Sequence, residues 1–547
     1  MDVADLIIQT LVSHGVKTIY GVPGDYVLKL FDKVEKCSDI DLVCTAGEEG
    51  ASFAADAHAR IAGFGVCMVT FGVGALKAMN AIAGAYVEQS RVLIISGAPG
   101  IEERESNQYL HHVHKSPDTQ CRMFDELCIS TAVLDSELTA FEKLTDVLDA
   151  IKLHSLPGYI EVPRDILNKK APIPRRKYAS IPSLLENVDV TDRYRSEGLE
   201  VLEWMRSRTS PVVVAGFEIQ RMGLQDKLLA LIEREGWPCA SSLSGKSVIS
   251  ERHPLSLGTY CGVMSKPFIL DKVENSDGVL LIGMPLNDID TGFSSAKLPE
   301  KNTIQVTSRM GLKWESGISC AFLTPSSLLK IWLEADSPER PKDFTPMKRI
   351  ETFVPKPNTD ITVRRLTMAI ESIVTEEHCI LADVGDALFS AADIHVARPS
   401  SFFSSCFWAS LGFALPAAIG AYIADPIHKP IVITGDGSFL MCATELATLI
   451  RYHIPATVII LDNKGYGTER PMLDGPFNEV QEVDHVSLAK ALGCVDAIQA
   501  TSEIDVLDAL QKLMLCQSGP TLLCVSLKRD DLSDALVSIT QANRKNV

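Results

Sequence analysis

The stretch from Pro430 to Glu469 constrains the fold of this chain more than any other. An apolar run, Ile431 to Thr434, is followed by a helix-like segment and then by a second apolar run, Ala456 to Leu461. Two buried-strand patterns that flank one predicted helix indicate a βαβ unit, and such units build parallel sheets. The sequence therefore predicts an open α/β domain in this region.

Polar side chains and glycines gather where these two strands end. Gly435-Asp436-Gly437-Ser438 follows the first strand, and Asp462-Asn463-Lys464-Gly465 follows the second. Open α/β sheets bind ligands beyond the carboxyl ends of their strands, and glycine lets backbone groups approach a ligand closely. Carboxylate and amide oxygens suit Mg²⁺, which proteins usually hold together with substrate phosphates. Taken alone, however, a Gly-Asp-Gly turn is more often an ordinary strand-to-helix connection.

The composition is that of a large globular protein. The 547 residues are 46% hydrophobic and 22% charged, which predicts several domains with large cores. The net charge of −18, without a dense basic tract, argues against nucleic acid as a partner. Fourteen scattered cysteines indicate reduced thiols in a cytoplasmic protein. The acidic start at Met1 does not resemble a signal peptide, and the lack of a long apolar run predicts no membrane span.

Strand-like and helix-like segments alternate along the chain. This alternation predicts an α/β fold with three doubly wound parallel-sheet domains. Two segments rich in proline and charge, 167–183 and 336–357, are predicted linkers. The resulting domain limits are 1–170, 185–340 and 358–547.

Three further candidate sites lie in the N-terminal third. Asp25 ends a strand-to-helix turn, where an aspartate commonly caps the helix. Glu48 opens an Ala-rich helix, where it also suits the helix dipole, and Glu49 competes for the same role. His111 and His112 are adjacent, so both reach one site only from a loop; isolated pairs of this kind are more often surface imidazoles.

These motifs, taken in order, resemble those of thiamine diphosphate (ThDP)-dependent 2-oxo acid decarboxylases. The family's diphosphate-binding motif has Gly-Asp-Gly, about two dozen residues, then Asn-Asn; here Asp462 replaces the first Asn and Asn463 keeps the second. The interval from Glu48 to Asp56 resembles the segment that supplies the family's glutamate, and it favours Glu48 over Glu49. The resemblance covers nearly the whole chain.

The histidine pair and two departures refine the resemblance. His111-His112 stands where non-oxidative decarboxylases carry such a pair. Asp386 replaces the threonine typical of pyruvate decarboxylases and is closer to the phenylpyruvate and indolepyruvate branch. Lys77 stands where a small polar residue is expected. The resemblance implies an aromatic or long-chain 2-oxo acid substrate, such as phenylpyruvate or indolepyruvate, although Glu469 is also a pyruvate decarboxylase feature.

The resemblance implies ThDP and Mg²⁺ as cofactors and assigns the residues that serve them. Residues 1–170 become the pyrimidine-binding domain, 185–340 a structural or regulatory middle domain, and 358–547 the diphosphate- and Mg²⁺-binding domain. The implied metal ligands are Asp436, Asn463 and Gly465. The implied cofactor-binding residues are Glu48, Asp386, Leu411, Gly435, Asp436, Gly437, Ser438, Asn463 and Gly465. The implied catalytic residues are Glu48, Asp25, His111, His112 and Glu469.

The implied reaction is decarboxylation to an aldehyde through a cofactor-bound enamine. Glu48 would protonate N1′ of the pyrimidine and Leu411 would enforce the bent cofactor, while the other catalytic groups would transfer protons around the enamine. The resemblance also implies a homodimer or homotetramer with the site between subunits. Two alternatives remain: an FAD-dependent carboligase similar to acetolactate synthase, which the His pair and Glu469 argue against, and a non-catalytic ThDP- or nucleotide-binding regulator.

Overall fold

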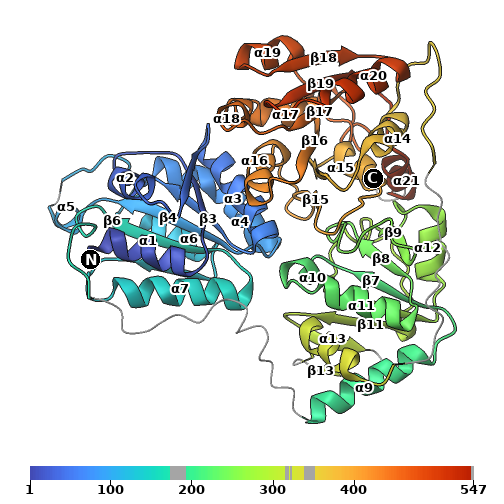
Figure 1. The fold of residues 1–547 in the computed structure, drawn as a ribbon, viewed down its shortest axis with the longest axis horizontal. Coiled ribbons are helices and arrows are strands. Elements are labelled where there is room, and N and C mark those ends of the chain that lie inside the picture. The colour runs from blue at the N-terminus through green and yellow to red at the C-terminus, as the bar shows by residue number, and fades with distance from the viewer. Residues whose placement is uncertain (107, 173–191, 315–318, 321–322, 338–350, 544–547) are drawn as a thin grey trace. The chain divides into compact units, whose positions relative to one another are not determined.

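A computed structural model describes residues 1–106, 108–172, 192–314, 319–320, 323–337 and 351–543. These residues form three β-sheets flanked by helices, which confirms the predicted α/β fold (Figure 1). Contacts divide the chain into two units. The first comprises Met1–Asn187, Trp408–Pro426 and Cys442–Ile454, and the second comprises the remainder. The three domain limits stay a prediction, and most of both predicted linkers lies outside the described residues.

The first sheet belongs to the first unit and is parallel throughout, in the order β2-β1-β3-β4-β6-β5. Strands β3, β4 and β6 are buried along their whole length, as expected for a sheet covered on both faces. The strands are β1 (Thr18–Gly21), β2 (Asp41–Cys44), β3 (Gly65–Val69), β4 (Val92–Ala98), β5 (Ser130–Val133) and β6 (Gly158–Pro163). The helices are α1 (Val3–Ser13), α2 (Leu28–Glu35), α3 (Glu48–Ala62), α4 (Val73–Val87), α5 (Ile101–Glu105), α6 (Thr119–Asp125) and α7 (Ala140–His154).

The Ala-rich sequence of α3 reflects close helix packing. Helix α16 (Ala414–Ala424), also in the first unit, lies against α3 so tightly that a Cβ on Gly420 would come 1.9 Å from the carbonyl oxygen of Ala54. Arg60 and Asp56 form a two-point ion pair on the same helix, with nitrogen–oxygen distances of 2.9 and 2.7 Å. Small side chains and this buried pair therefore fix the helix that begins at Glu48.

The second sheet has the order β13-β12-β11-β10-β7-β8-β9. Its β12 and β13 pair antiparallel, which departs from the prediction of a purely parallel sheet because a short connection after β11 turns the chain back. The strands are β7 (Pro211–Ala215), β8 (Cys239–Ser242), β9 (Ser256–Tyr260), β10 (Gly278–Ile282), β11 (Thr303–Thr307), β12 (Gly311–Trp314) and β13 (Ser319–Cys320). The helices are α9 (Asp192–Arg206), α10 (Glu218–Arg221), α11 (Gln225–Glu235), α12 (Pro267–Glu274), η1 (Glu300–Asn302) and α13 (Pro325–Glu334).

The third sheet is parallel, in the order β15-β14-β16-β17-β19-β18, and shares the second unit with the second sheet. The strands are β14 (His378–Ala382), β15 (Phe402–Phe403), β16 (Lys429–Gly435), β17 (Thr457–Asp462), β18 (Asp496–Ala500) and β19 (Thr521–Ser526). The helices are α14 (Val363–Ile373), α15 (Asp386–Ala391), α17 (Asp436–Cys442), α18 (Glu445–Arg451), η2 (Pro476–Asn478), α19 (His485–Leu492), α20 (Glu503–Leu513) and α21 (Asp534–Asn543).

The prediction of a single helix between β16 and β17 is wrong, since two helices, α17 and α18, lie there. The N–H of Leu446 donates to the carbonyl of Ala443, three residues back, at 3.1 Å, so a tight turn interrupts the helical ladder. Contacts place α18 with the first unit. Among the described residues, no helix combines the length and the apolar character needed to cross a membrane.

Candidate functional site

Asp25, His111 and His112 form one cluster in the first unit. The Nε2 atom of His111 lies 2.8 Å from Oδ2 of Asp25, and one ligand-type atom from each of the three side chains lies within 4.8 Å of the others. Asp25 follows β1, whereas both histidines lie on the loop after α5. The structure thus brings together three of the residues predicted to transfer protons, and their roles stay a prediction.

The loop that carries the histidines has an unusual backbone. His112 has φ 64°, in the left-handed region that non-glycine residues rarely occupy. Gly72 faces it, and a Cβ there would come 2.3 Å from the carbonyl oxygen of His112. The buried Gln120 side chain accepts from the Gly72 N–H at 2.6 Å and donates to the Tyr159 hydroxyl at 2.6 Å. Gln120 therefore fixes the turn against which His112 lies.

Tyr26 and Arg164 complete the surroundings of Asp25 and were not predicted. The Tyr26 ring stacks on His111, with centroids 4.8 Å apart, and its hydroxyl donates to the His111 carbonyl at 3.2 Å. Nη1 of Arg164 lies 3.8 Å from Oδ2 of Asp25. Arg164 also pairs with Glu103, and this hydrogen bond lowers the pKa of Glu103. Tyr26 and Arg164 belong to no sequence pattern, so only the fold reveals their position beside Asp25.

Glu48 is buried at the N-terminus of α3. Gly74 leaves room for its carboxylate, because a Cβ there would come 3.2 Å from Oε1. Nζ of Lys77 lies 3.3 Å from Oε2. Glu49, the competing candidate, is exposed and accepts from the side-chain amide of Asn80 at 2.7 Å. The geometry therefore favours Glu48 as the buried carboxylate of this region.

Glu445 holds the turn that precedes Glu48, and sequence reasoning missed it. Its carboxylate accepts from the N–H groups of Ala46 and Gly47 at 3.2 and 3.1 Å and from the Thr448 hydroxyl at 2.7 Å. Burial raises the pKa of Glu445, although these hydrogen bonds oppose the rise. The two peptide donors come from far earlier in the chain, so no local spacing signals this role.

In the second unit, Asp436 and Asn463 follow the adjacent parallel strands β16 and β17. Oδ1 of Asp436 accepts from the Gly437 N–H at 2.7 Å, and Oδ2 accepts from the Gly465 N–H at 3.0 Å. Asn463 is also buried. The structure thus groups three residues predicted to hold Mg²⁺: Asp436, Asn463 and Gly465.

The electrostatics of this group fit a cation. Burial, reinforced by the nearby Asp462 carboxylate, raises the pKa of Asp436 to about 6. A buried carboxylate of this kind is costly to ionise without a counter-charge, which a divalent ion would supply. Asp462 stands where the family motif has a neutral asparagine. Lys464 lies 3.0 Å from Asp462, so its positive charge offsets the additional negative charge. The donor set is all oxygen, as Mg²⁺ prefers.

Asp386 begins α15 and reaches the segment before α21. Its Oδ2 accepts from the Ser533 N–H at 2.9 Å, whereas Oδ1 is buried without a hydrogen-bond partner among the described residues. Burial raises the pKa of Asp386 to about 6, and the Ser533 hydrogen bond opposes the rise. An unpartnered buried oxygen at the end of β14 fits a site for a polar ligand group.

Glu469 lies on an exposed turn of the second unit beside an apolar segment. The N–H groups of Met472 and Leu473 donate to its carbonyl at 2.9 and 3.0 Å. Met472 is 55% exposed, Leu473 70% and Phe477 66%. Three large apolar side chains in the segment after Glu469 are therefore exposed and could cover an apolar ligand group.

The remaining predicted cofactor residues are placed as follows. A Cβ on Gly435 would meet no atom within 4 Å, whereas one on Gly437 would come 2.7 Å from the Tyr466 ring. Ser438 is buried on α17. Leu411 is half-buried and belongs to the first unit, as Glu48 does. All of these roles stay a prediction.

The middle sheet carries an anionic side chain at the point where its strand order changes direction. Strand order changes direction between β7 and β10, where open α/β sheets bind dinucleotides. There the Gly216 N–H donates to the Ile282 carbonyl at 2.9 Å, and the Glu218 N–H donates to the Gly283 carbonyl at 3.1 Å. The buried Glu218 carboxylate accepts from the Ser308 N–H at 2.8 Å. Backbone hydrogen bonds and an anionic side chain thus lie at this point, and the charge of Glu218 disfavours the phosphates of FAD or of a nucleotide there.

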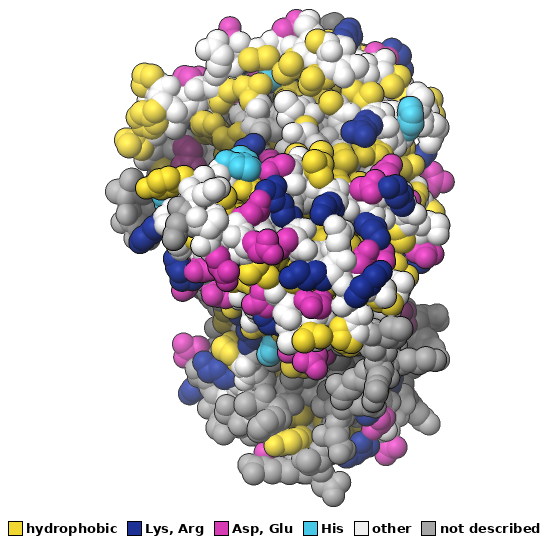
Figure 2. All heavy atoms as spheres, turned by 90° about the vertical axis from the view of Figure 1, so that its left-hand side faces the viewer, with side chains coloured by type: hydrophobic (Ala, Val, Ile, Leu, Met, Phe, Trp, Pro, Cys, Tyr) yellow, Lys and Arg dark blue, Asp and Glu magenta, His cyan; other side chains and the backbone are white. Residues whose placement is uncertain are grey.

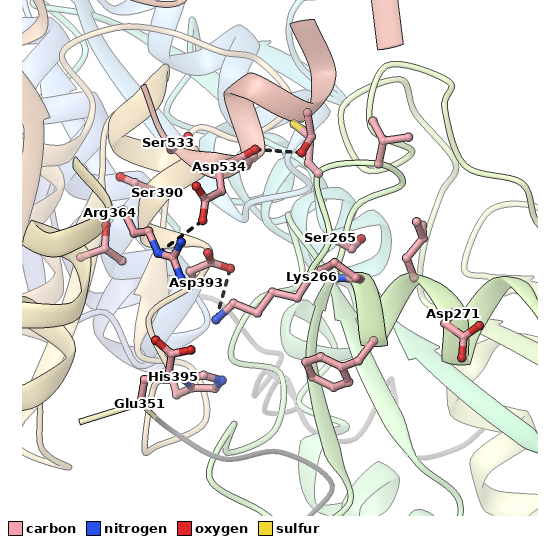
Figure 3. A pocket seen from close by; sticks show the side chains of 18 of the residues that line it. Ser265, Lys266, Asp271, Glu351, Arg364, Ser390, Asp393, His395, Ser533 and Asp534 are labelled. Atoms are coloured by element: carbon pink, nitrogen blue, oxygen red, sulfur yellow. Dashed lines mark hydrogen bonds and ion pairs between the residues drawn. The ribbon is translucent and has the colours of Figure 1, made fainter. Parts of the chain in front are cut away.

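A hollow of about 950 Å³ lies between α12 and the helices α14 and α21 of the second unit (Figure 3). Its charged side chains engage one another across the gap. Lys266 lies 3.6 Å from Asp393, and Arg364 lies 3.6 Å from Asp534. Figure 2 likewise shows acidic and basic side chains interspersed on one face of the molecule. The first pair therefore links an element of the second sheet to one of the third, and the second pair joins two helices of the third.

Comparisons with known proteins agree along the chain. Residues 1–123 match the thiamine pyrophosphate enzyme N-terminal TPP binding domain, residues 199–310 the central domain, and residues 383–525 the C-terminal TPP binding domain. The chain is 30% identical to the indole-3-pyruvate decarboxylase of Azospirillum brasilense, over 100% of this chain and 99% of that protein. It is 27% identical to a probable pyruvate decarboxylase of Schizosaccharomyces pombe and 25% identical to the pyruvate decarboxylase of Neurospora crassa, each over 98% of this chain and 95% of the relative.

Proposed function

Because this chain belongs to the thiamine diphosphate-dependent 2-oxo acid decarboxylase family, we propose roles for the residues of its two half-sites and a class of substrate. The protein is an enzyme that removes CO₂ from a 2-oxo acid. When bound, ThDP supplies the electron sink that accepts the electron pair left as CO₂ departs. Side chains offer no comparable sink. The protein's own part is therefore to bind and orient the cofactor and the substrate and to transfer protons.

The proposed metal ligands are Asp436, Asn463 and the carbonyl of Gly465, and the proposed metal is Mg²⁺. This proposal is supported by the buried oxygen donors and by the raised pKa of Asp436. A bound cation would lower that pKa again and keep the carboxyl group ionised. Glycines 435 and 437 would let the diphosphate approach the start of α17. Asp386, Leu411 and Ser438 would line the rest of the cofactor site.

The proton carriers fall into two groups. Glu48 is proposed to hold a proton at N1′ of the pyrimidine, a role supported by its burial and by the space that Gly74 leaves. Asp25, His111, His112 and Glu469 are proposed to move protons at the reacting carbon. The 2.8 Å contact between Asp25 and His111 supports direct proton exchange between these two groups.

The proposed substrate is an aromatic or long-chain 2-oxo acid, such as phenylpyruvate or indolepyruvate. The observation that carries this proposal is the exposure of three large apolar side chains, Met472, Leu473 and Phe477, in the segment that follows Glu469. Such side chains gain free energy when they cover an apolar substrate group, which pyruvate lacks. The Azospirillum brasilense relative, an indole-3-pyruvate decarboxylase, is named for a substrate of this class.

A steady-state comparison of pyruvate, branched 2-oxo acids, phenylpyruvate and indolepyruvate tests the proposal. We expect kcat/KM for the aromatic acids to exceed that for pyruvate by about tenfold or more, since burying one methylene discriminates by about 1–3 kcal/mol. Met472→Ala should lower kcat/KM for the aromatic acids and leave that for pyruvate nearly unchanged. A preference for pyruvate in the wild type would refute the substrate class.

The Glu218 carboxylate at the strand-order change of the middle sheet supports the decarboxylase over an FAD-dependent carboligase. Purified protein should therefore lack the flavin absorption band, whereas a yellow protein that releases FAD on denaturation would favour the carboligase. Release of CO₂ from any member of the 2-oxo acid panel separates the enzyme from a non-catalytic regulator.

We propose a homodimer or homotetramer in which the cofactor lies between subunits, as the family resemblance implies. Equilibrium sedimentation at assay concentrations should show no active monomer. We also propose a cytoplasmic location, because the 14 cysteines are scattered through the sequence without paired spacing, as in proteins of a reducing compartment.

A further inference from the structure

The cluster of Asp25, His111 and His112 has the composition of a metal site. Two imidazoles and one carboxylate each offer a ligand atom, and these atoms lie within 4.8 Å of one another. This mixed nitrogen and oxygen set differs from the oxygen set around Asp436. Imidazole nitrogen suits zinc and neighbouring transition metals, whereas Mg²⁺ prefers oxygen.

The protein holds these ligands in place before any metal binds. The left-handed backbone at His112 turns two adjacent histidines toward one point, and Gly72 supplies the space that this conformation needs. Tyr26 stacks on the His111 ring with an interplanar angle of 18°. Strained backbone of this kind persists where the surrounding structure requires it, so the convergence is built rather than incidental.

We propose that Asp25, His111 and His112 form a second metal site, separate from the Mg²⁺ site, that binds Zn²⁺ and similar divalent transition metals. Three protein ligands with one open position form a common zinc arrangement. In tetrahedral coordination the ligand atoms lie about 3.3–3.5 Å apart, given metal–ligand bonds of about 2.0–2.2 Å. The 2.8 Å contact between His111 and Asp25 and the 4.8 Å limit of the cluster bracket this separation. Small side-chain rotations therefore suffice.

The site is reachable and its charge is balanced. Asp25 and His111 are exposed, so a hydrated ion can enter and keep a water ligand. Arg164 lies 3.8 Å from Asp25 but is paired with Glu103, which limits its repulsion of a cation. A bound ion would coordinate the nitrogen and oxygen atoms of Asp25, His111 and His112 that are proposed to carry protons. Zn²⁺ therefore inhibits decarboxylation reversibly, a consequence that rests on the proton-transfer roles proposed above.

Binding is tested on the holoenzyme at saturating Mg²⁺ and ThDP. Zn²⁺ bound per chain is measured by equilibrium dialysis, and Co²⁺, a visible probe of coordination geometry, is titrated in parallel. His111→Ala and Asp25→Asn should each weaken the tightest site by at least about 10–100-fold, the range found even for outer-shell changes. His114→Ala is the matched control, since it removes an exposed imidazole from the same loop without touching the cluster.

The two variants and the control separate the outcomes. Loss of one Zn²⁺ per chain in His111→Ala and Asp25→Asn, but not in His114→Ala, supports the site. Equal Zn²⁺ binding in all four proteins overturns it. If the site is present but saturating Zn²⁺ leaves turnover unchanged, the metal site stands and the proposed proton-transfer roles fail. Inhibition of wild type that chelation reverses supports both.

Discussion

Replacing Gly50 with alanine should disturb the site through Glu445. A Cβ on Gly50 would come 2.1 Å from Oε1 of Glu445 and 2.7 Å from its Cδ. Ordinary contacts begin at 3.4 Å, so the carboxylate must withdraw by about 1.3 Å. Such a movement breaks its hydrogen bond from Gly47 N–H, which lies at 3.1 Å.

The energetic cost follows from these contacts. A buried N–H that loses its acceptor costs about 1–3 kcal/mol, and overpacking costs about another 1–3 kcal/mol. Alanine in place of glycine within α3 returns at most about 1 kcal/mol. We therefore expect a net destabilisation of about 3 kcal/mol in the first unit. Because the turn leads directly into Glu48, the carboxylate proposed to hold a proton at N1′ shifts with it.

ThDP affinity is the decisive measurement. At saturating Mg²⁺, isothermal titration should show the dissociation constant of ThDP raised by at least about tenfold, which corresponds to about 1.4 kcal/mol. Gly47→Ala is the control, since a Cβ there meets nothing within 4 Å and its φ of −149° suits alanine. If Gly50→Ala binds ThDP like the wild type, or if both variants lose affinity equally, the role given to Glu445 is refuted.

Four further outcomes are expected. Asp436→Ala should release ThDP, and EDTA should inactivate the wild type until Mg²⁺ and ThDP are restored. Glu48→Gln should slow deuterium exchange at C2 of bound ThDP by about 10²–10⁴-fold, while His112→Ala lowers turnover and leaves this exchange near wild type. Lys77→Ala should tighten ThDP binding by less than about fivefold, because it frees Glu48 from an ion pair with the exposed Lys77 side chain, which is worth at most about 1 kcal/mol. The raised pKa of Asp386 means that its folded state favours the protonated carboxyl, so cofactor-free protein should lose up to about 3 kcal/mol of stability as pH rises from about 4 through 6. Urea unfolding of Asp386→Asn should show a smaller loss over that range.

The sequence predicts those parts of the site whose chemistry is local. Asp436 and Asn463 follow strands that the apolar runs identify, and parallel pairing brings the ends of adjacent strands together. Apolar runs likewise coincide with β7 and β10 of the second sheet. The spacing of apolar residues and the order of the strands therefore predict most of the fold and the position of the proposed metal ligands.

Contacts between distant segments were beyond the sequence. Glu445 bonds to residues about 400 positions earlier, and Arg164 reaches Asp25 from the far end of the first sheet domain. The antiparallel strands β12 and β13 were also missed, since short edge strands have weak patterns. Each case depends on packing that no local spacing encodes.

The charges of the third-sheet site imply that Mg²⁺ and ThDP depend on each other for binding. Asp436 and Asp462 are buried carboxylates at neighbouring strand ends, and Lys464 pairs with Asp462 rather than with Asp436. A diphosphate that entered alone would meet the negative charge of Asp436, whereas a cation between them converts this repulsion into attraction. Coupling between two ligands is reciprocal, so Mg²⁺ should raise ThDP affinity by the same factor by which ThDP raises Mg²⁺ affinity. Titrations of each ligand with and without the other should give equal factors. An affinity for ThDP that does not change with Mg²⁺ would contradict the placement of the metal between Asp436 and the diphosphate.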